Sequence, residues 1–275
     1  MRRILLFAVA ATLVFAGPTN AETIRIAGSG QMLPLASELA AAYLKKYPSD
    51  QVLVNPNSLG QRGGVQAVSE GLIDIATSAR RLDNDERKLQ VKEYVFANVA
   101  GFFAVNPSVS IGSLTSKQIC AIYSGKIRNW KEVGGPDAAI VAFTRPEVDS
   151  TKIVMRRHLP GFAKLQEPPH IISVQKSRDL ILGLMKTPYS IGMTDATNLS
   201  KFEGKIVALR LDGRDITSSI TGPIQHRYCF VLKKKPRPVD LRFMEFVYSP
   251  EGQAITRNNK AYPIKPASGP SRLRR

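Results

Sequence analysis

The sequence predicts an α/β fold of two lobes, each a mostly parallel sheet flanked by helices. Short apolar strands alternate with helical patterns along most of the chain, which is typical of parallel sheets with helices on their faces. Polar, glycine-containing loops follow several of these strands, and the carboxyl ends of parallel strands meet at one edge of a sheet. A hydrophobic content of 43% in 275 residues fits a globular chain with one large core or two modest ones.

Residues 1–21 have the pattern of an export signal. Arg2 and Arg3 precede an apolar run over residues 4–16, and the small residues of segment 19–21 precede Glu22. No cysteine lies near this point to carry a lipid, and no later run of about eighteen apolar residues predicts a membrane anchor. We therefore expect a periplasmic protein secreted through a cleavable signal peptide, not a lipoprotein, with full secretion left open.

The chain is basic, with a formal net charge of +17 that falls to +15 if Arg2 and Arg3 are removed. This charge can be an ordinary solvated surface or a positive field that attracts anions. Residues 233–237 form the densest basic cluster, but no aromatic platform accompanies them, so we expect no nucleic-acid partner. Residues 267–275 are expected to form a flexible basic tail.

Cysteine and histidine usage argues against metal or redox chemistry. Cys120 and Cys229 are the only cysteines, and a disulfide between them is open in an oxidising compartment. They lie in a helical and a strand pattern far apart in the chain, so we expect two buried thiols. The histidines at 158, 170 and 226 have neither metal-ligand nor triad spacing.

Lobe 1 is expected to comprise residues 22–106 and 226–266. The patterns predict its first strands at 23–27, 51–54, 72–76 and 94–105, and its first helices at 32–47, 65–71 and 83–92. Gly28, Ser29 and Gly30 form a sharp turn from strand to helix, and the glycines permit close approach of a ligand to backbone N–H groups. Such a turn also forms without a ligand. The polar segment 57–64, which contains Ser58, follows the second strand in the same way.

Lobe 2 is expected at residues 107–225. The patterns predict helices at 114–123, 151–159 and 178–185, and strands at 140–143, 170–174 and 189–193. Residues 227–232 are similar in apolar character to residues 101–105, and these two strands could pair as the crossings between the lobes. Two more helices, at 239–248 and from 249, complete lobe 1.

The segment 145–151 has the pattern of an oxyanion site. An apolar strand ends at Arg145, and Ser150 and Thr151 lie where a helix begins. A guanidinium offers a planar donor fork, and a helix start adds hydroxyls and free N–H groups, although Ser and Thr cap many helices that bind nothing. Together with the loops at Gly28 and Ser58, this segment would surround one small anion in an interlobe cleft.

Several motifs resemble those of the phosphate-binding proteins of ABC transporters. They lie at residues 28–35, 71–76 followed by Ser78 and Arg80, 114–119, 122–130 and 249–254. The resemblance covers about residues 23–266 and implies a two-lobed periplasmic binding protein-like fold with inorganic phosphate or a related oxyanion as its ligand. It also implies an ABC transporter permease as partner, no cofactor and no catalysis. We expect a monomer.

The chain departs from the family pattern within the site itself. Gln31 stands where relatives carry Thr, and Asp149 and Ser150 stand where relatives carry Ser and Gly. Ala79 lies nearest to an aspartate that accepts the phosphate proton in some members. Asp149 could replace this acceptor or cap the helix from outside, and we favour the cap.

These observations give a set of expected ligand contacts and one alternative. The expected contacts come from Ser29, Gly30, Gln31, Ser58, Arg145, Ser150 and Thr151, with Ser78, Arg80 and Asp149 as secondary candidates. The alternative is a family member whose cleft is degenerate and which acts as a sensor or a protein-interaction subunit.

Overall fold

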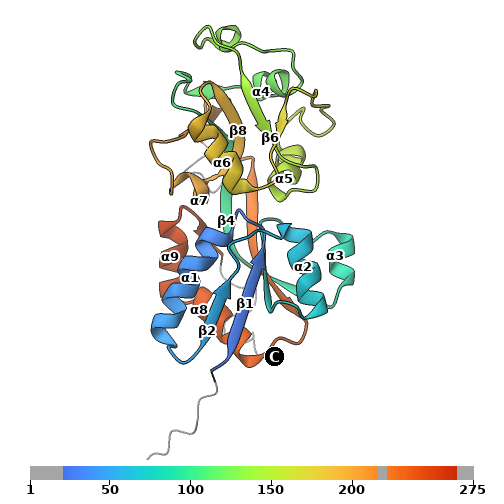
Figure 1. The fold of residues 1–275 in the computed structure, drawn as a ribbon, viewed down its shortest axis with the longest axis vertical. Helices are drawn as coiled ribbons and strands as arrows, with labels where there is room; N and C mark the ends of the chain where they lie inside the picture. Colours follow the sequence, from blue (N-terminus) through green and yellow to red (C-terminus); the bar gives the residue numbers. More distant parts are fainter. Residues whose placement is uncertain (1–20, 216–221, 265–275) are drawn as a thin grey trace, which may run out of the picture.

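A computed structural model describes residues 21–215 and 222–264. Most of the expected signal peptide, residues 1–20, and the expected tail at 267–275 lie outside these ranges. Two lobes are stacked along the long axis of the molecule, and two strands, β4 and β11, run between them (Figure 1). Each lobe combines parallel strands with flanking helices, so the predicted fold class is confirmed.

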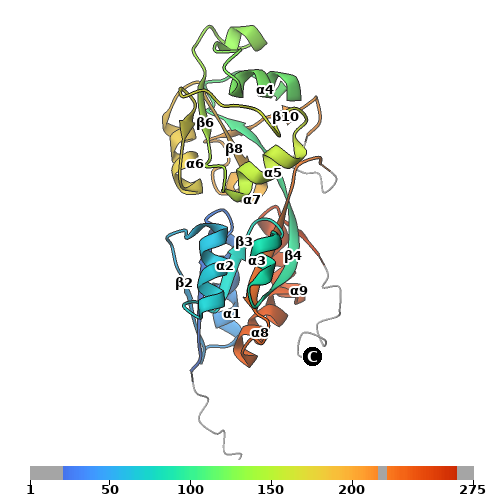
Figure 2. The ribbon, with the colours of Figure 1, turned by 90° about the vertical axis from the view of Figure 1, so that its right-hand side faces the viewer.

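Lobe 1, the lower lobe in Figure 1, is built on three parallel strands. β1 (Thr23–Gly28) lies between β2 (Gln51–Val54) and β3 (Ile75–Ser78) and pairs in parallel with both. One side of this sheet carries α1, α8 and α9 and the other carries α2 and α3, as the two views show (Figure 2). The helices span Leu33–Lys46 (α1), Gly60–Glu70 (α2), Asn84–Lys88 (α3), Pro238–Val247 (α8) and Pro250–Asn258 (α9).

The lobes are joined by a long strand and its antiparallel partner. β4 (Val91–Val105) pairs with β11 (Gln225–Lys233) from Ala100 opposite Gln225 to Val91 opposite Lys233. The crossing strands therefore pair, but not through residues 101–105 as their similar composition suggested. That part of β4 enters the upper lobe, where it pairs with β8 (Ser190–Asp195).

In lobe 2, the upper lobe in Figure 1, the sheet continues from β8 to β6 (Val141–Thr144) and β7 (Ile172–Ser173). β6 is parallel to both β8 and β7. The helices are α4 (Ser116–Tyr123), α5 (Ser150–His158), α6 (Ser177–Lys186), α7 (Ala196–Leu199) and a 3-10 turn at Trp130–Val133. Short strands complete the fold: β5 (Ser113–Leu114), β9 (Val207–Ala208), β10 (Arg210–Leu211) and β12 (Tyr262–Pro263).

Two expectations about cysteines and membrane segments can be compared with the structure. Cys120 and Cys229 are both free thiols, but only Cys229 is buried as expected, because Cys120 on α4 is partly exposed. Burial raises the pKa of each. Within residues 21–215 and 222–264, no helix has the length and apolar character needed to cross a membrane. The same ranges contain no group of three His, Cys, Asp or Glu side chains that could hold a metal ion.

Helix α2 begins at Gly60, earlier than the predicted start at residue 65, and its glycines explain why. A Cβ on Gly64 would lie 2.7 Å from the Cα of Gly28, so the bare backbone lets α2 pack directly on the end of β1. Gly64, one of the glycines that suggested a loop at 57–64, therefore serves helix-to-strand packing.

We expect Gly64→Ala to lower the free energy of unfolding by about 1–3 kcal/mol, because the added methyl group overpacks a backbone contact. Gly63→Ala is the matched control in the same helix, since its Cβ would meet only the Leu59 Cβ at 3.4 Å. Gly63→Ala should raise the stability by about 0.5–1 kcal/mol through helix propensity. Urea denaturation measures both, and equal effects would contradict this account of α2.

Candidate functional site

The loops that follow β1, β6 and β8 meet between the lobes and enclose a small cavity. Its lining includes Gln31 from lobe 1 and, from lobe 2, Arg145, Thr151, Ser177, Met193, Thr194 and Asn198. We call this the inner cavity. Its volume is about 10 Å³, which is close to the minimum that holds one water molecule. An oxyanion therefore requires some displacement of the surrounding side chains.

Arg145 lies at the end of β6 and supplies the positive charge of the inner cavity. Its side chain is only 5% exposed. Nη1 donates to the Val174 carbonyl at 2.8 Å, and Nη2 donates to Asp149 at 2.7 Å and to the Ser177 hydroxyl at 3.4 Å. Among the described residues, the buried Nε has no hydrogen-bond partner. A buried donor without a partner is costly, and it is a feature that an anionic ligand would relieve.

Asp149 is the N-cap of α5, so the favoured interpretation of this residue is confirmed. Its Oδ1 accepts from the backbone N–H groups of Thr151 at 2.9 Å and Lys152 at 3.3 Å. Its Oδ2 accepts from Arg145. The carboxylate thus both caps the helix and offsets part of the Arg145 charge, and it takes two N–H groups that an anion could otherwise use.

Gln31 carries a hydrogen-bonded bridge from lobe 1 into lobe 2. Its side-chain carbonyl accepts from the Thr151 hydroxyl at 2.9 Å. Its amide nitrogen donates to Asp195 and lies 3.3 Å from Nε2 of His226. The residue is 3% exposed. A carboxamide of the protein therefore already bonds the hydroxyl that the sequence assigned to the ligand.

A buried polar network surrounds Asp195, the acceptor for the Gln31 amide. Asp195 accepts from the Tyr228 hydroxyl at 2.7 Å, the Thr197 hydroxyl at 2.7 Å and the Asn198 backbone N–H at 2.9 Å. Burial, followed by the charge of Asp195, raises the pKa of Tyr228. Burial also lowers the pKa of His226, although Asp195 acts in the opposite direction. A neutral His226 can accept from the Gln31 amide.

The lobes touch on both sides of the Gln31 bridge. Ser150 donates through its hydroxyl to the Gln61 side-chain carbonyl at 3.0 Å, which joins α5 to α2. Lys201 forms an ion pair with Glu38 on α1. The structure therefore holds the two lobes in contact, with the inner cavity between these bonds.

Comparison with known proteins places the chain in a family. The family model described as the PBP superfamily domain matches residues 14–251. This protein belongs to the PBP superfamily. Among PBP relatives, it is 29% identical over 194 residues to the phosphate-binding protein PstS of Bacillus subtilis (strain 168), covering 70% of this chain and 62% of the relative. It is 28% identical over 196 residues to PstS of Borreliella burgdorferi, covering 69% of this chain and 70% of the relative.

Solved PBP structures share the fold. A structure described as a phosphate ABC transporter substrate-binding protein from Clostridium perfringens, with phosphate bound, matches with a TM-score of 0.81 at 24% identity. The match covers 88% of this chain and all of that chain. PstS from Borrelia burgdorferi matches with a TM-score of 0.56 at 26% identity, covering 89% of this chain and 99% of that chain.

Within this PBP fold, the predicted contacts divide into three groups. Gln31, Arg145 and Thr151 converge on the inner cavity, and Asp149 and Ser150 lie directly beside it. Gly30 and Ser58 line instead a larger space between α1 and segment 56–58 on one lobe and α6 and α7 on the other, which we call the outer pocket. Ser29 is buried, and its N–H donates to the Thr77 carbonyl at 3.0 Å.

Ser78 and Arg80 line neither the inner cavity nor the outer pocket, and their side chains bond within lobe 1. The buried Arg80 Nε, like the Arg145 Nε, has no hydrogen-bond partner among the described residues. The Ser78 hydroxyl donates to the Arg80 carbonyl at 2.6 Å. The Arg80 guanidinium forms a bidentate pair with Glu86 at 2.9 and 3.0 Å, with both side chains buried. We therefore leave both residues out of the proposed PBP site.

Sequence reasoning missed Ser177, Asn198 and Asp195. Asp195 is the last residue of β8 and the N-cap of α7, Asn198 lies on α7, and Ser177 begins α6 shortly after β7. All three therefore lie at strand-to-helix junctions. This is the signal that identified Arg145. The strand predicted at 189–193 ends before the polar residues Thr194 and Asp195, which belong to β8.

Proposed function

We propose that this protein is a periplasmic solute-binding protein that captures phosphate or a similar tetrahedral oxyanion between its lobes for an ABC transporter. The observation that carries the proposal is the buried, unpartnered Nε of Arg145, a residue that lines the inner cavity together with Thr151, Ser177 and Asn198. The PstS relatives, named as phosphate-binding proteins, support it. We further propose delivery to a membrane permease, a monomeric state and export through a cleavable signal peptide.

In this proposal, the anion displaces the Gln31 carboxamide and takes over its partners. Arg145 donates through Nε, while the Thr151 and Ser177 hydroxyls and the Asn198 amide complete the donor set. Asp195, whose oxygen accepts from Gln31 in the structure, then faces the anion. A carboxylate can accept the proton of hydrogen phosphate, whereas it repels sulfate, which carries no proton at neutral pH. Asp195 would thus provide the acceptor that Ala79 lacks.

We expect isothermal titration of the purified chain at pH 7 to show heat for phosphate and weaker binding for sulfate. A lost hydrogen bond to a charged group is worth about 1.5–3 kcal/mol, so phosphate should bind roughly 10- to 150-fold more tightly. Chloride and nitrate at equal ionic strength are the controls for general attraction to a basic protein. Equal affinity for phosphate and sulfate would contradict the role of Asp195.

The second candidate is a family member with a degenerate cleft that acts as a sensor or a protein-interaction subunit. Two observations favour it: Gln31 already bonds Thr151, and Asp149 already pairs with Arg145. The same titration separates the candidates, because a degenerate cleft gives no heat with any anion of the panel.

A further inference from the structure

The outer pocket is far larger than an inorganic anion needs. Its volume is about 460 Å³, within the range of roughly 300–1,000 Å³ that is usual for small organic ligands. The lobes are already in contact at Ser150 and Gln61 and at Lys201 and Glu38. The outer pocket is therefore present although the lobes touch, so it does not result from separation of the two lobes.

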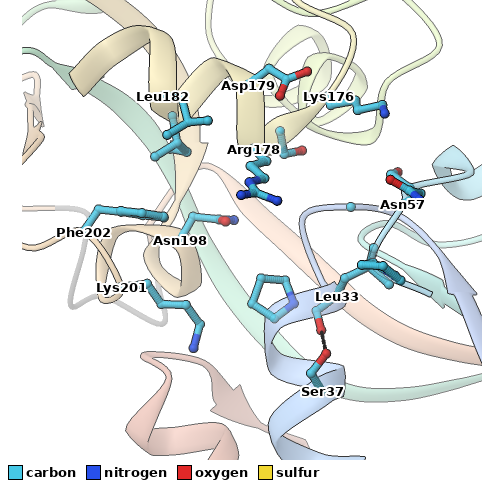
Figure 3. Close-up of a pocket in the computed structure, with 16 residues that line it drawn as sticks. Leu33, Ser37, Asn57, Lys176, Arg178, Asp179, Leu182, Asn198, Lys201 and Phe202 are labelled. Carbon is cyan, nitrogen blue, oxygen red and sulfur yellow. Dashed lines mark hydrogen bonds between the residues drawn. The ribbon is translucent and has the colours of Figure 1, made fainter. Parts of the chain in front are cut away.

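The lining of the outer pocket combines apolar surface with positive charge. Leu33 and Pro34 at the start of α1 and Phe202 after α7 provide apolar contacts. Figure 3 shows the Arg178 guanidinium extending toward the middle of the pocket, with Phe202 and Lys201 on one side and Asn57 on the other.

The cations of this lining differ in whether they are paired. Lys201 has Glu38 as its partner, whereas Lys176 and Arg178 are exposed and make no ion pair within the described parts of the chain. Asp179 also belongs to the lining. Lys176 and Arg178 can thus pair with a ligand, and Asp179 is the one carboxylate that the lining contains.

The outer pocket adjoins the inner cavity through two shared residues. Ser177 and Asn198 line both spaces, and both belong to the donor set proposed for the anion. A phosphoryl group bound near Arg145 would therefore lie next to a space that can hold a carbon skeleton. Orthophosphate would leave this space and both cations without a contact.

We propose that the preferred ligand is a phosphate monoester that carries a second anionic group. Its phosphoryl group binds at the inner cavity in the singly protonated form, so that Asp195 accepts its proton as it does from hydrogen phosphate. The second pKa of a phosphate monoester is about 6, so this form is abundant at pH 6. The carbon skeleton lies against Leu33, Pro34 and Phe202, and the second anion pairs with Arg178 and Lys176. This inference rests on the proposed function, because it uses the same anion site.

The test is titration calorimetry of the purified chain at pH 6, where about half of a phosphate ester keeps a proton, with orthophosphate, glycerol 3-phosphate and 3-phosphoglycerate. We expect 3-phosphoglycerate to bind at least tenfold more tightly than orthophosphate, with glycerol 3-phosphate between them. Arg178→Gln should weaken 3-phosphoglycerate binding about tenfold and leave the orthophosphate affinity unchanged. Arg87→Gln, at an exposed position on α3 outside the pocket, removes the same charge and should change neither affinity.

The outcomes separate this inference from the proposed function. Orthophosphate that binds as tightly as both esters, or more tightly, overturns the inference and leaves the proposed function standing. Absence of heat with all three compounds overturns both. If Arg178→Gln and Arg87→Gln weaken 3-phosphoglycerate binding equally, the preference comes from overall charge and the assignment of Arg178 is wrong.

Discussion

Arg145→Ala is expected to weaken phosphate binding about 10- to 150-fold. The change removes charge-assisted hydrogen bonds worth about 1.5–3 kcal/mol from a group that is only 5% exposed. Titration calorimetry measures the affinity, and a thermal melt shows whether the variant is folded. A folded Arg145→Ala protein with the wild-type affinity for phosphate would rule out the inner cavity as the anion site.

Two further variants separate the charge of Arg145 from its geometry. Arg145→Lys keeps the charge but loses the planar fork, so it should recover only part of the affinity. Asp149→Asn keeps an N-cap, because Asn and Asp cap helices equally well, and removes a negative charge that pairs with Arg145. We expect Asp149→Asn to bind phosphate more tightly than wild type. Weaker binding would mean that Asp149 contacts the ligand as an acceptor.

Glu86→Ala is expected to lower the free energy of unfolding by about 3–5 kcal/mol. The Glu86 carboxylate is the bidentate partner of Arg80, and their side chains are 3% and 6% exposed, so the change leaves a buried guanidinium without its main partner. Glu86 also accepts from the Asp83 backbone N–H at 2.9 Å as part of a capping box, which α3 would lose. Urea denaturation at constant pH measures the loss.

Asp85→Ala is the matched control on the same helix. Asp85 pairs with Lys88 on the surface, with side-chain exposures of 78% and 76%, so its removal should change the stability by no more than about 1 kcal/mol. If the two substitutions cost the same, the Arg80 and Glu86 pair is not a structural element of lobe 1. Arg80 would then be reconsidered as an anion contact.

The sequence was informative where a local pattern decides the structure. Strand-to-helix junctions predicted Gln31, Arg145 and Thr151, which come from opposite lobes and line one cavity. The rule that parallel strands end at a common edge was enough to bring these residues together. The N-cap role of Asp149 was also predictable, because it depends only on residues within the first turn of α5.

The partners of these side chains were not predictable, because they depend on contacts between distant segments. Nothing near Arg80 in the sequence distinguishes a ligand contact from the partner of Glu86. Helix α3 was predicted to continue to residue 92, but it ends at Lys88 because Val91 begins β4 and pairs with Lys233. The pairing of segments so far apart in the chain cannot be predicted from the residues around Val91 alone.

Any ligand of the inner cavity has to compete with the Gln31 carboxamide for Thr151 and Asp195. The carboxamide is part of the chain, so dilution cannot remove it, and tethered groups reach effective concentrations on the order of millimolar. A ligand's observed affinity is its intrinsic affinity multiplied by the fraction of molecules in which Gln31 has withdrawn. In the proposed function, the ligand concentration at which half of the molecules are occupied therefore depends on Gln31, a side chain that need not touch the bound ligand.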